Sequence, residues 1–192
     1  MFQFFRGKHQ ILSVAKLSAI CIIAVMLLTG CGTTSLSLKA DPQANLVQYK
    51  SLSIQTAAAD GVVITDLAQN RIKDRLKAEI SSGCCPNRFA SINTDTVRPG
   101  DLLLVLKFTK YDEGNRFARA MLAGLGAMKI DAEVEVKDAV SGNGICKGAV
   151  GKSFAWGGMY GAMTGIEDVE KDFAKEIGRG VGEMLGYLPK SE

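Results

Sequence analysis

Apolar and polar residues alternate strictly along residues 129–140. The apolar positions are Ile130, Ala132, Val134 and Val136, and charged residues stand between most of them. Because successive side chains of a β-strand point to opposite faces, this pattern predicts a strand with one buried face and one face in water. A sheet built from such strands needs a second layer over its apolar face, which other parts of the chain must supply.

Two segments have the spacing of amphipathic helices and can supply that layer. Residues 66–82 place Leu67, Ile72, Leu76 and Ile80 on one stripe, with charged residues between them. Residues 167–188 form a second stripe from Val169, Phe173, Ile177, Val181, Met184 and Leu185. Thr65 or Asp66 can cap the first helix, and Gly83 fits its end.

Several short runs outside these helices have strand-like composition. They are residues 47–54, 88–93, 101–111 and 145–154, the last joined to residues 129–140 by a turn at residues 141–144. In chain order the elements are β-α-β-β-β-β-α. The sequence therefore predicts an α+β fold: a single small sandwich with an antiparallel sheet of four to five strands and two helices packed on it.

The N-terminal region has the layout of an export signal. Arg6, Lys8 and Lys16 precede an apolar run from Leu17 to Leu28, and no acidic residue accompanies them. A helix needs about 20 apolar residues to span a bilayer, so this run is short for a permanent anchor. We expect a cleaved signal peptide rather than a membrane-spanning helix.

Cys31 follows the apolar run directly after small residues. Leu28-Thr29-Gly30-Cys31 resembles the lipobox of bacterial lipoproteins. The resemblance implies cleavage before Cys31, a diacylglycerol on its sulfur and an acyl chain such as palmitate on its amino group, which together anchor firmly. In a two-membrane cell, Gly32 at the next position points to the outer membrane and its periplasmic face. The expected divisions are a signal peptide at residues 1–30, a lipid-anchored tether at residues 31–45 and a domain at residues 46–192.

Charge and histidine content argue against several functions. The whole chain carries a net charge of +3, but the three basic residues of the export segment account for it, so the mature chain is neutral. A neutral chain without a basic cluster is a poor nucleic-acid ligand. His9 is the only histidine and leaves with the signal peptide, which removes serine–histidine and cysteine–histidine pairs. We expect no enzyme activity, no cofactor and no metal.

Three cysteines remain in the expected domain, at Cys84, Cys85 and Cys146. Disulfides persist in the oxidising envelope, and a bridge from Cys146 to Cys84 or Cys85 would leave one thiol over. Neighbouring cysteines can also bridge each other, although the backbone is then strained. The alternative, three unpaired thiols, is equally compatible with the sequence.

Two apolar segments are candidates for contact with a partner. One is residues 117–128 and the other is residues 156–165. Exposed apolar surface of this kind marks contact with protein, membrane or ligand, although a short helix closing over the core explains the first segment equally well. The candidate contact residues are Phe117, Met121, Leu122, Leu125, Trp156, Met159 and Tyr160.

Glycines recur at every fourth position in the C-terminal part. The two series are Gly157, Gly161 and Gly165, and then Gly178, Gly182 and Gly186. Such a smooth strip allows another backbone to approach closely. It could serve self-association or docking of a partner, or it could pack on the protein's own sheet.

Residues 46–188 resemble the family called domain of unknown function 4410. The similar parts are the strand DLLLVLKFTKYDEGN, the segment NRFARAMLAGLGAM, the hairpin IDAEVEVKDAVSGNGICKG and the glycine-rich loop before the last helix. The resemblance implies an envelope lipoprotein with a small α+β domain and no established activity. The pair Cys84–Cys85 is not part of this pattern.

We therefore interpret the chain as a membrane-anchored envelope lipoprotein. It would act as a non-catalytic accessory or scaffold that binds another envelope component, either an envelope protein or a second copy of the chain. The alternative is a periplasmic carrier or binding module for a small apolar ligand. An enclosed cavity would favour the carrier, whereas an exposed apolar patch would favour the scaffold.

Overall fold

Six strands form one sheet in the part of the chain that the computed structural model describes, residues 33–34, 36, 38, 44–122 and 125–189. The strands are β1 (Thr33–Thr34), β2 (Ser51–Ala58), β3 (Ser91–Asn93), β4 (Leu102–Asp112), β5 (Met128–Asp138) and β6 (Gly144–Phe154). The expected signal peptide and the lipidation candidate Cys31 lie outside the described residues.

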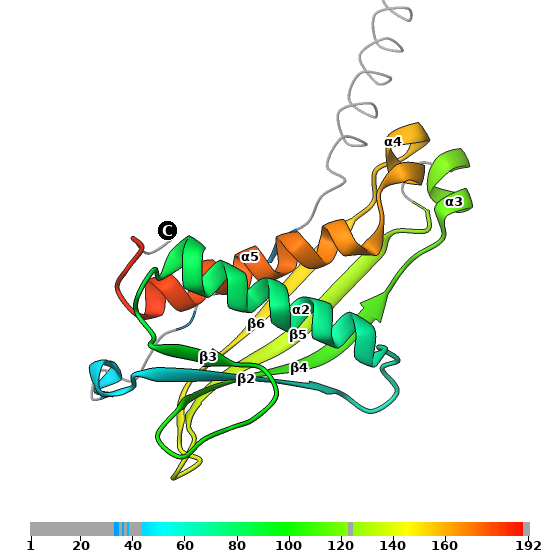
Figure 1. Cartoon of the computed structure of the whole chain (residues 1–192). Coiled ribbons are helices and arrows are strands. Elements are labelled where there is room, and N and C mark those ends of the chain that lie inside the picture. The colour runs from blue at the N-terminus through cyan, green and yellow to red at the C-terminus, as the bar shows by residue number, and fades with distance from the viewer. Residues whose placement is uncertain (1–32, 35, 37, 39–43, 123–124, 190–192) are drawn as a thin grey trace, which may run out of the picture. The chain divides into compact units, whose positions relative to one another are not determined.

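The helices differ greatly in length. α2 (Asp66–Ala78) continues into the wider turns of η2 (Glu79–Cys84), and α5 (Ile166–Met184) closes the fold (Figure 1). α3 (Arg116–Met121), α4 (Gly158–Met163) and η1 (Leu46–Gln48) are short. Among the described residues, no helix has both the length and the apolar character needed to cross a bilayer. Leaving aside β1 and the short helices, the predicted order β-α-β-β-β-β-α is confirmed.

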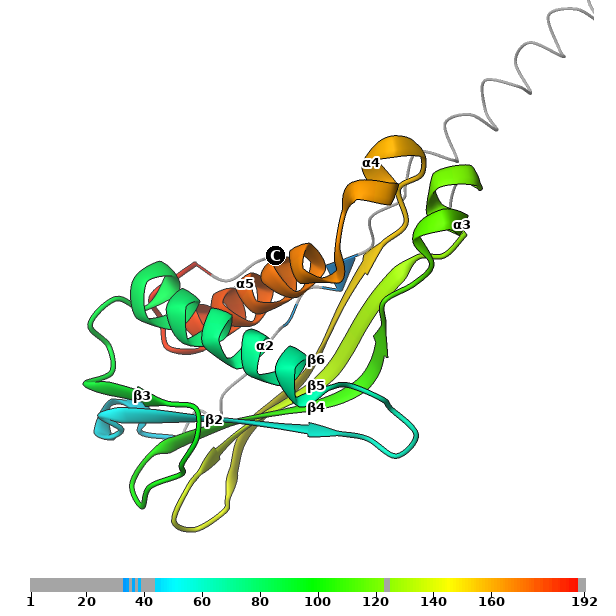
Figure 2. The same ribbon diagram turned by 45° about the vertical axis from the view of Figure 1, so that its right-hand side comes forward.

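The strand order across the sheet is β1-β6-β5-β4-β2-β3. β4, β5 and β6 are antiparallel neighbours, as predicted, and Val134 of β5 lies opposite Leu106 and Gly148. β2 instead runs parallel to both β4 and β3. Parallel neighbours need a crossover connection, and α2 with η2 provides it between β2 and β3 (Figure 2). The sheet is therefore mixed, within the predicted α+β class.

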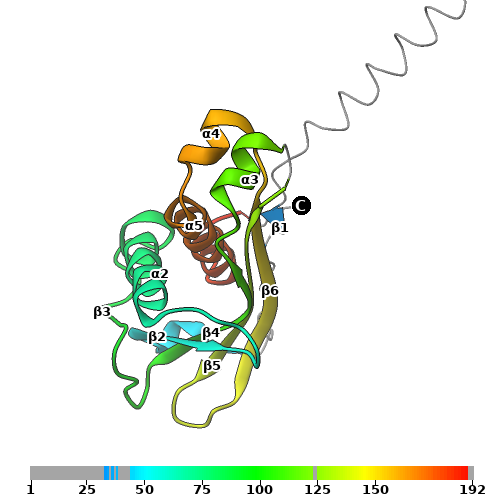
Figure 3. The same cartoon turned by 90° about the vertical axis from the view of Figure 1, so that its right-hand side faces the viewer.

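α2 and α5 lie side by side on one face of the sheet (Figure 3). The stripe that α2 buries is Ala68, Ile72 and Leu76, so Leu67 lies one position off it and is exposed. On α5, Phe173 is fully buried, and its ring centroid lies 6.1 Å from that of Phe108 on β4. This apolar layer between helices and sheet is the core of the domain.

Glu170 is a buried carboxylate that joins α5 to α2 and β4. Arg71 donates to its two oxygens from Nη2 at 2.8 Å and Nε at 3.0 Å, Arg75 Nη1 donates at 2.9 Å, and the Tyr111 hydroxyl donates at 2.8 Å. The hydrogen bonds to Glu170 raise the pKa of Arg71. Burial, followed by the hydrogen bond to Glu170, raises the pKa of Tyr111. All four groups have partners, so the cluster is a structural tie.

Part of the segment expected to be a tether, residues 31–45, belongs to the sheet. β1 pairs antiparallel with β6, where Thr33 lies opposite Lys152 and Thr34 opposite Gly151. The pairing begins two residues after Cys31 in the sequence. The fold therefore starts close to the expected anchor.

Two leucines of the same segment belong to the core. Leu36 and Leu38 are buried, and Leu36 packs closely on Gly180 of α5, where an added Cβ would come within 2.9 Å of it. Two isolated leucines in a small polar stretch have no periodicity that predicts an element. For this reason the sequence placed the start of the domain too late, near Leu46.

The glycines of α5 allow close packing inside the domain. A Cβ on Gly178 would lie 2.5 Å from Glu79 Cγ of η2, and one on Gly182 would lie 3.1 Å from Cys84 Cβ. This side of α5 is therefore covered by η2. The spacing of the glycines indicated close packing, and the side chains that approach them, those of Glu79, Cys84 and Leu36, belong to the same chain.

Candidate functional site

α3 and α4 pack against each other at one end of the sheet. With their flanking residues they form what we call the tip, residues 113–122, 125–127 and 155–165 (Figures 1 and 2). α3 lies between β4 and β5, and α4 lies between β6 and α5. The two segments meet because β4 and β6 both end on this side and β5 begins there.

The tip holds most of the exposed large apolar side chains, eight of thirteen among the described residues. Met159 exposes 81% of its surface and Phe117 exposes 75%. All seven sequence-predicted contact residues are exposed here, and Met163 joins them. We call this set the apolar patch: Phe117, Met121, Leu122, Leu125, Trp156, Met159, Tyr160 and Met163. The structure thus brings the two candidate segments into one surface, and α3 does not turn its apolar side chains to the core.

Local sequence explains how each short helix begins. Asn115 caps α3, and its side-chain Oδ1 accepts from the Ala118 amide at 3.0 Å. α4 begins at Gly158, which has a positive φ of 70°, a conformation that favours glycine. Helices this short are marginal by themselves, so their packing on each other must stabilise them.

Arg119 is the tie between the two short helices. Its side chain is 1% exposed, and its guanidinium donates to four backbone carbonyl oxygens. Two belong to the α4 region: Gly161 O, 3.0 Å from Nε, and Thr164 O, 3.3 Å from Nη2. Two belong to the α3 loop: Glu113 O at 3.3 Å and Gly126 O at 2.8 Å, both from Nη1. Burial, and then the charge of Arg116, lowers the pKa of Arg119.

Glycines permit this close approach. A Cβ on Gly161 would lie 1.9 Å from the carbonyl oxygen of Trp156, and one on Gly114 would lie 2.2 Å from that of Gly126. No side chain larger than hydrogen fits either position without moving the backbone. The tip is therefore a defined unit held by hydrogen bonds.

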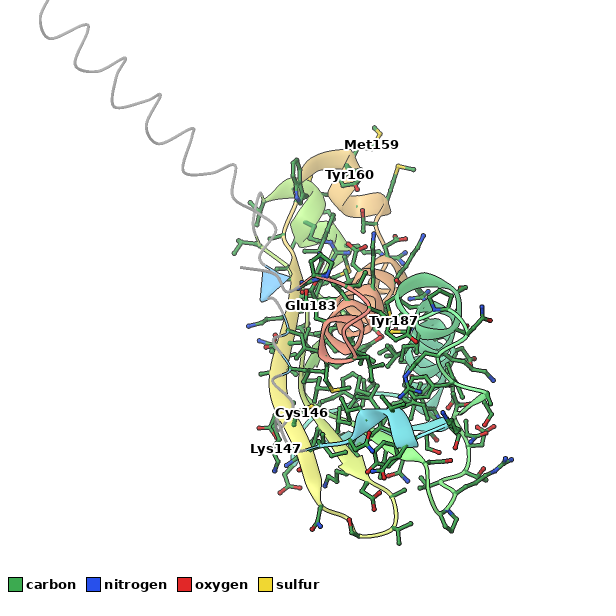
Figure 4. All side chains as sticks on the ribbon, turned by 90° about the vertical axis from the view of Figure 1, so that its left-hand side faces the viewer. Cys146, Lys147, Met159, Tyr160, Glu183 and Tyr187 are labelled. Atoms are coloured by element: carbon green, nitrogen blue, oxygen red, sulfur yellow. The ribbon has the colours of Figure 1, made fainter. Side chains whose placement is uncertain are left out.

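Aromatic rings connect the tip to the sheet. The centroid of the Tyr160 ring lies 5.9 Å from the ring centroid of Phe154, the last residue of β6, and 6.2 Å from that of Trp156. Figure 4 shows Met159 and Tyr160 at one end of the domain, away from Cys146 and Lys147 of β6. The position of the patch is thus fixed relative to the end of β6.

An open groove of about 520 Å³ runs from the tip toward α5. Its apolar wall includes Phe154 and Met163, and its charged wall includes Lys152, Asp168 and Asp172. The Lys152 ammonium lies 3.4 Å from a carboxylate oxygen of Asp172. A shallow groove with paired charges differs from the enclosed, mostly apolar sites that hold small ligands.

The uncovered face of the sheet carries ion pairs. Glu135 lies 2.6 Å from Lys137 Nζ and 2.7 Å from Lys147 Nζ. The hydrogen bonds from Lys137 and then Lys147 lower the pKa of Glu135, so this carboxylate is ionised and unsuited to act as a general acid. The sequence predicted that one face of this strand lies in water, and Glu133 and Glu135 are on that face.

The three cysteines are buried thiols in two places. Cys84 and Cys85 have their Sγ atoms 2.9 Å apart, farther than the roughly 2.05 Å of a disulfide. Cys146 Sγ lies 3.2 Å from Met184 Sδ. The mutual hydrogen bond and burial raise the pKa of Cys84, and burial raises that of Cys146 to about 11. The structure brings Cys84 and Cys85 together; the pairing in the cell stays a prediction.

Metal ligands do not converge anywhere in the described part of the chain: no group of three or more histidine, cysteine, aspartate or glutamate side chains could hold an ion there. Sequence reasoning missed Arg119 as a structural residue. The sequence shows only a lone arginine inside the apolar run FARAM, and a lone arginine is ordinarily an exposed residue.

Similarity to solved structures concerns the fold. A DUF330 protein of Xanthomonas campestris has a TM-score of 0.51 at 12% identity, and the match covers 80% of this chain and 93% of that one. A PelC dodecamer from Paraburkholderia phytofirmans has a TM-score of 0.46 at 11% identity, and the match covers 84% of this chain and 99% of that one. A minor lipoprotein from Acinetobacter baumannii has a TM-score of 0.37 at 18% identity, and the match covers 75% of this chain and 97% of that one.

No curated protein matches the chain significantly. A family model matches residues 32–158, which is more than half of the chain and includes the sheet and most of the tip. The match confirms the family that the sequence pattern resembled. The chain belongs to the family described as Domain of unknown function (DUF4410).

Proposed function

We propose that this protein is a lipoprotein of the bacterial cell envelope, anchored through lipid on Cys31, and that it acts as a non-catalytic accessory or scaffold. The tip binds another envelope component. The observation that carries this proposal is the apolar patch, because eight large apolar side chains gathered on one exposed surface mark a contact site. The outer membrane and its periplasmic face are the expected location.

The build of the tip supports a binding role. Arg119 fixes the two short helices to each other, so the patch is formed before any partner arrives. Preorganised surfaces bind with less loss of conformational entropy than flexible ones. Arg119 contacts backbone carbonyl oxygens of the domain itself, which gives it a structural role rather than a catalytic one.

A carrier of a small apolar ligand is the second candidate function. It would need a sheltered cavity, whereas the groove between the tip and α5 is open and bordered by charged residues. The exposed position of the patch favours a macromolecular or membrane contact.

In-cell crosslinking tests the proposal. A photoreactive residue is placed at Met121 or Tyr160 in the otherwise native lipoprotein, and adducts are identified by mass spectrometry. We expect both positions to capture an envelope component: a protein, a second copy or a lipid. Val140, which is exposed in the β5–β6 turn, is the matched control position.

Two results would count against the proposal. Equal or lower capture at Met121 and Tyr160 than at Val140 would remove the tip as the contact surface. The anchor is tested separately, because Cys31→Ser should yield an unlipidated, uncleaved precursor. A Cys31→Ser protein that is still cleaved and lipidated would contradict the anchor.

A further inference from the structure

We propose that the apolar patch docks on the lipid membrane itself, beside the anchored Cys31, so that the tip is a second membrane-contacting part of the protein. This inference rests on the lipid anchor proposed above and names the component that the tip contacts. It is argued from the register of β1, the composition of the patch and the fixed geometry of the tip.

The register of β1 places the anchor at the tip end of the sheet. Thr33 pairs with Lys152 and Thr34 with Gly151, so the chain enters β1 from the side of Phe154. Phe154 ends β6 and contacts Tyr160 of the tip. Cys31 precedes Thr33 by two residues, and two residues span at most about 7 Å. Lipid on Cys31 therefore enters the bilayer next to the tip.

This short connection limits what can face the patch. A long tether would let the domain turn any surface to the membrane, whereas two residues before a paired strand keep one end of the sheet at the lipid surface. The exposed apolar residues on that end are the ones next to the bilayer. Burying them in lipid removes them from water, which is favourable in proportion to their apolar area.

The composition of the patch suits a membrane interface. Trp156 and Tyr160 are the residue types enriched at the headgroup level, and Met159, Met163 and Phe117 are apolar side chains able to enter deeper. Charges at the base of the tip are of both signs, with Arg116 and Lys129 against Asp112 and Glu113. We therefore expect docking to depend on apolar insertion and only weakly on anionic lipid.

A second attachment also has a physical use. The lipid expected on Cys31 carries several acyl chains and anchors firmly by itself, but flexible lipid chains do not fix how the domain is oriented. The lipid on Cys31 supplies the affinity, and the rigid tip fixes the orientation of the domain, because Arg119 prevents α3 and α4 from moving independently.

Trp156 is the only tryptophan of the chain, so its fluorescence reports on the tip alone. The purified mature lipoprotein is incorporated into vesicles of phosphatidylethanolamine and phosphatidylglycerol, with or without acyl-chain-brominated lipid. We expect blue-shifted emission, strong quenching by brominated lipid and weak quenching by acrylamide. The double variant Phe117→Glu, Met159→Glu should lose the bromolipid quenching, whereas Val140→Glu at the opposite end of β5 should keep it.

Flotation with the vesicles separates the two proposals. Failure to float would contradict the lipid anchor itself. A protein that floats but shows water-exposed emission without bromolipid quenching would overturn the docking of the tip and leave the anchor intact. Shielding of Trp156 from acrylamide without bromolipid quenching, increasing with protein density in the membrane, would assign the patch to a second copy and also overturn it. Circular dichroism checks that the variants fold.

Discussion

Among the residues that the structure describes, three charged ones are buried, and each is stabilised by a different kind of partner. Glu170 lies between two arginines, Arg119 donates to backbone carbonyls, and Asp101 accepts from hydroxyl and amide groups. None of the three lines the groove between the tip and α5. A buried charge is costly unless its hydrogen-bonding capacity is used, and here it is used within the fold. These residues therefore contribute to structure.

Asp101 makes stability depend on pH. It precedes β4 and accepts from the Ser51 and Ser53 hydroxyls, from the Arg98 amide at 3.1 Å and from Asn93 Nδ2 at 3.4 Å. Burial raises the pKa of Asp101, but these hydrogen bonds outweigh it, and the net pKa lies below the usual value. The stabilisation is therefore complete above the unfolded-state pKa of about 3.9 and is lost as pH falls through the lower folded-state pKa.

We expect Asp101→Asn to destabilise the domain at pH 7 by about 1–3 kcal/mol, because its amide cannot accept all four bonds. The difference in the free energy of unfolding between wild type and variant should become smaller below about pH 4. Urea unfolding measured from pH 2 to pH 7 checks this. Asp95→Asn, an exposed change nearby, should follow the wild-type profile. A gap that stays constant down to pH 2 would show that ionisation of Asp101 is not what stabilises the fold.

At the scale of elements, the long ones could be predicted and the short ones could not. The alternation in β5 and the stripes of α2 and α5 repeat often enough to identify their type. α3 and α4 are six residues each, too short for a helical period to appear. The parallel pairing of β2 was also missed, although strand, helix and strand in succession imply a crossover. The residues of the patch could be named from the sequence because both segments are rich in apolar side chains. The burial of Arg119 could not, because it depends on contacts between segments that are distant in the sequence.

The coupling of α3 to α4 through Arg119 can be tested directly. Arg119→Leu leaves buried carbonyls without donors, at about 1–3 kcal/mol for each such group. We expect faster amide hydrogen exchange across the tip and little change in β4–β6. Arg119→Lys should loosen the tip too, because an ammonium lacks the planar fork that reaches both sides. Arg116→Leu removes the exposed arginine of α3 and should leave exchange unchanged. Unchanged exchange at the tip in Arg119→Leu would mean that packing alone holds the two helices.

At the scale of the whole domain, the β1 pairing and the patch belong to one end, the proposed anchor precedes β1 on that side, and the β5–β6 turn belongs to the other end. β5 has 11 residues, so at about 3.3 Å per residue the two ends lie roughly 35 Å apart. An anchor close to one end therefore sets an orientation: the tip faces lipid, and the turn with Val140 projects away from it. The ion-paired sheet face is then left free for other contacts.

This orientation predicts a gradient of distances to the membrane. Fluorophores are attached at Met159→Cys or Val140→Cys in the vesicle-bound lipoprotein, and energy transfer is measured to an acceptor on the lipid headgroups. We expect strong transfer from position 159 and weak transfer from position 140. Ten Gly-Ser residues inserted between Gly32 and Thr33 would let the chain reach roughly 17–19 Å on average, and the difference should shrink as the anchor loses its hold on orientation. Equal transfer from both positions in the native-length protein would mean that two residues before β1 do not orient the domain.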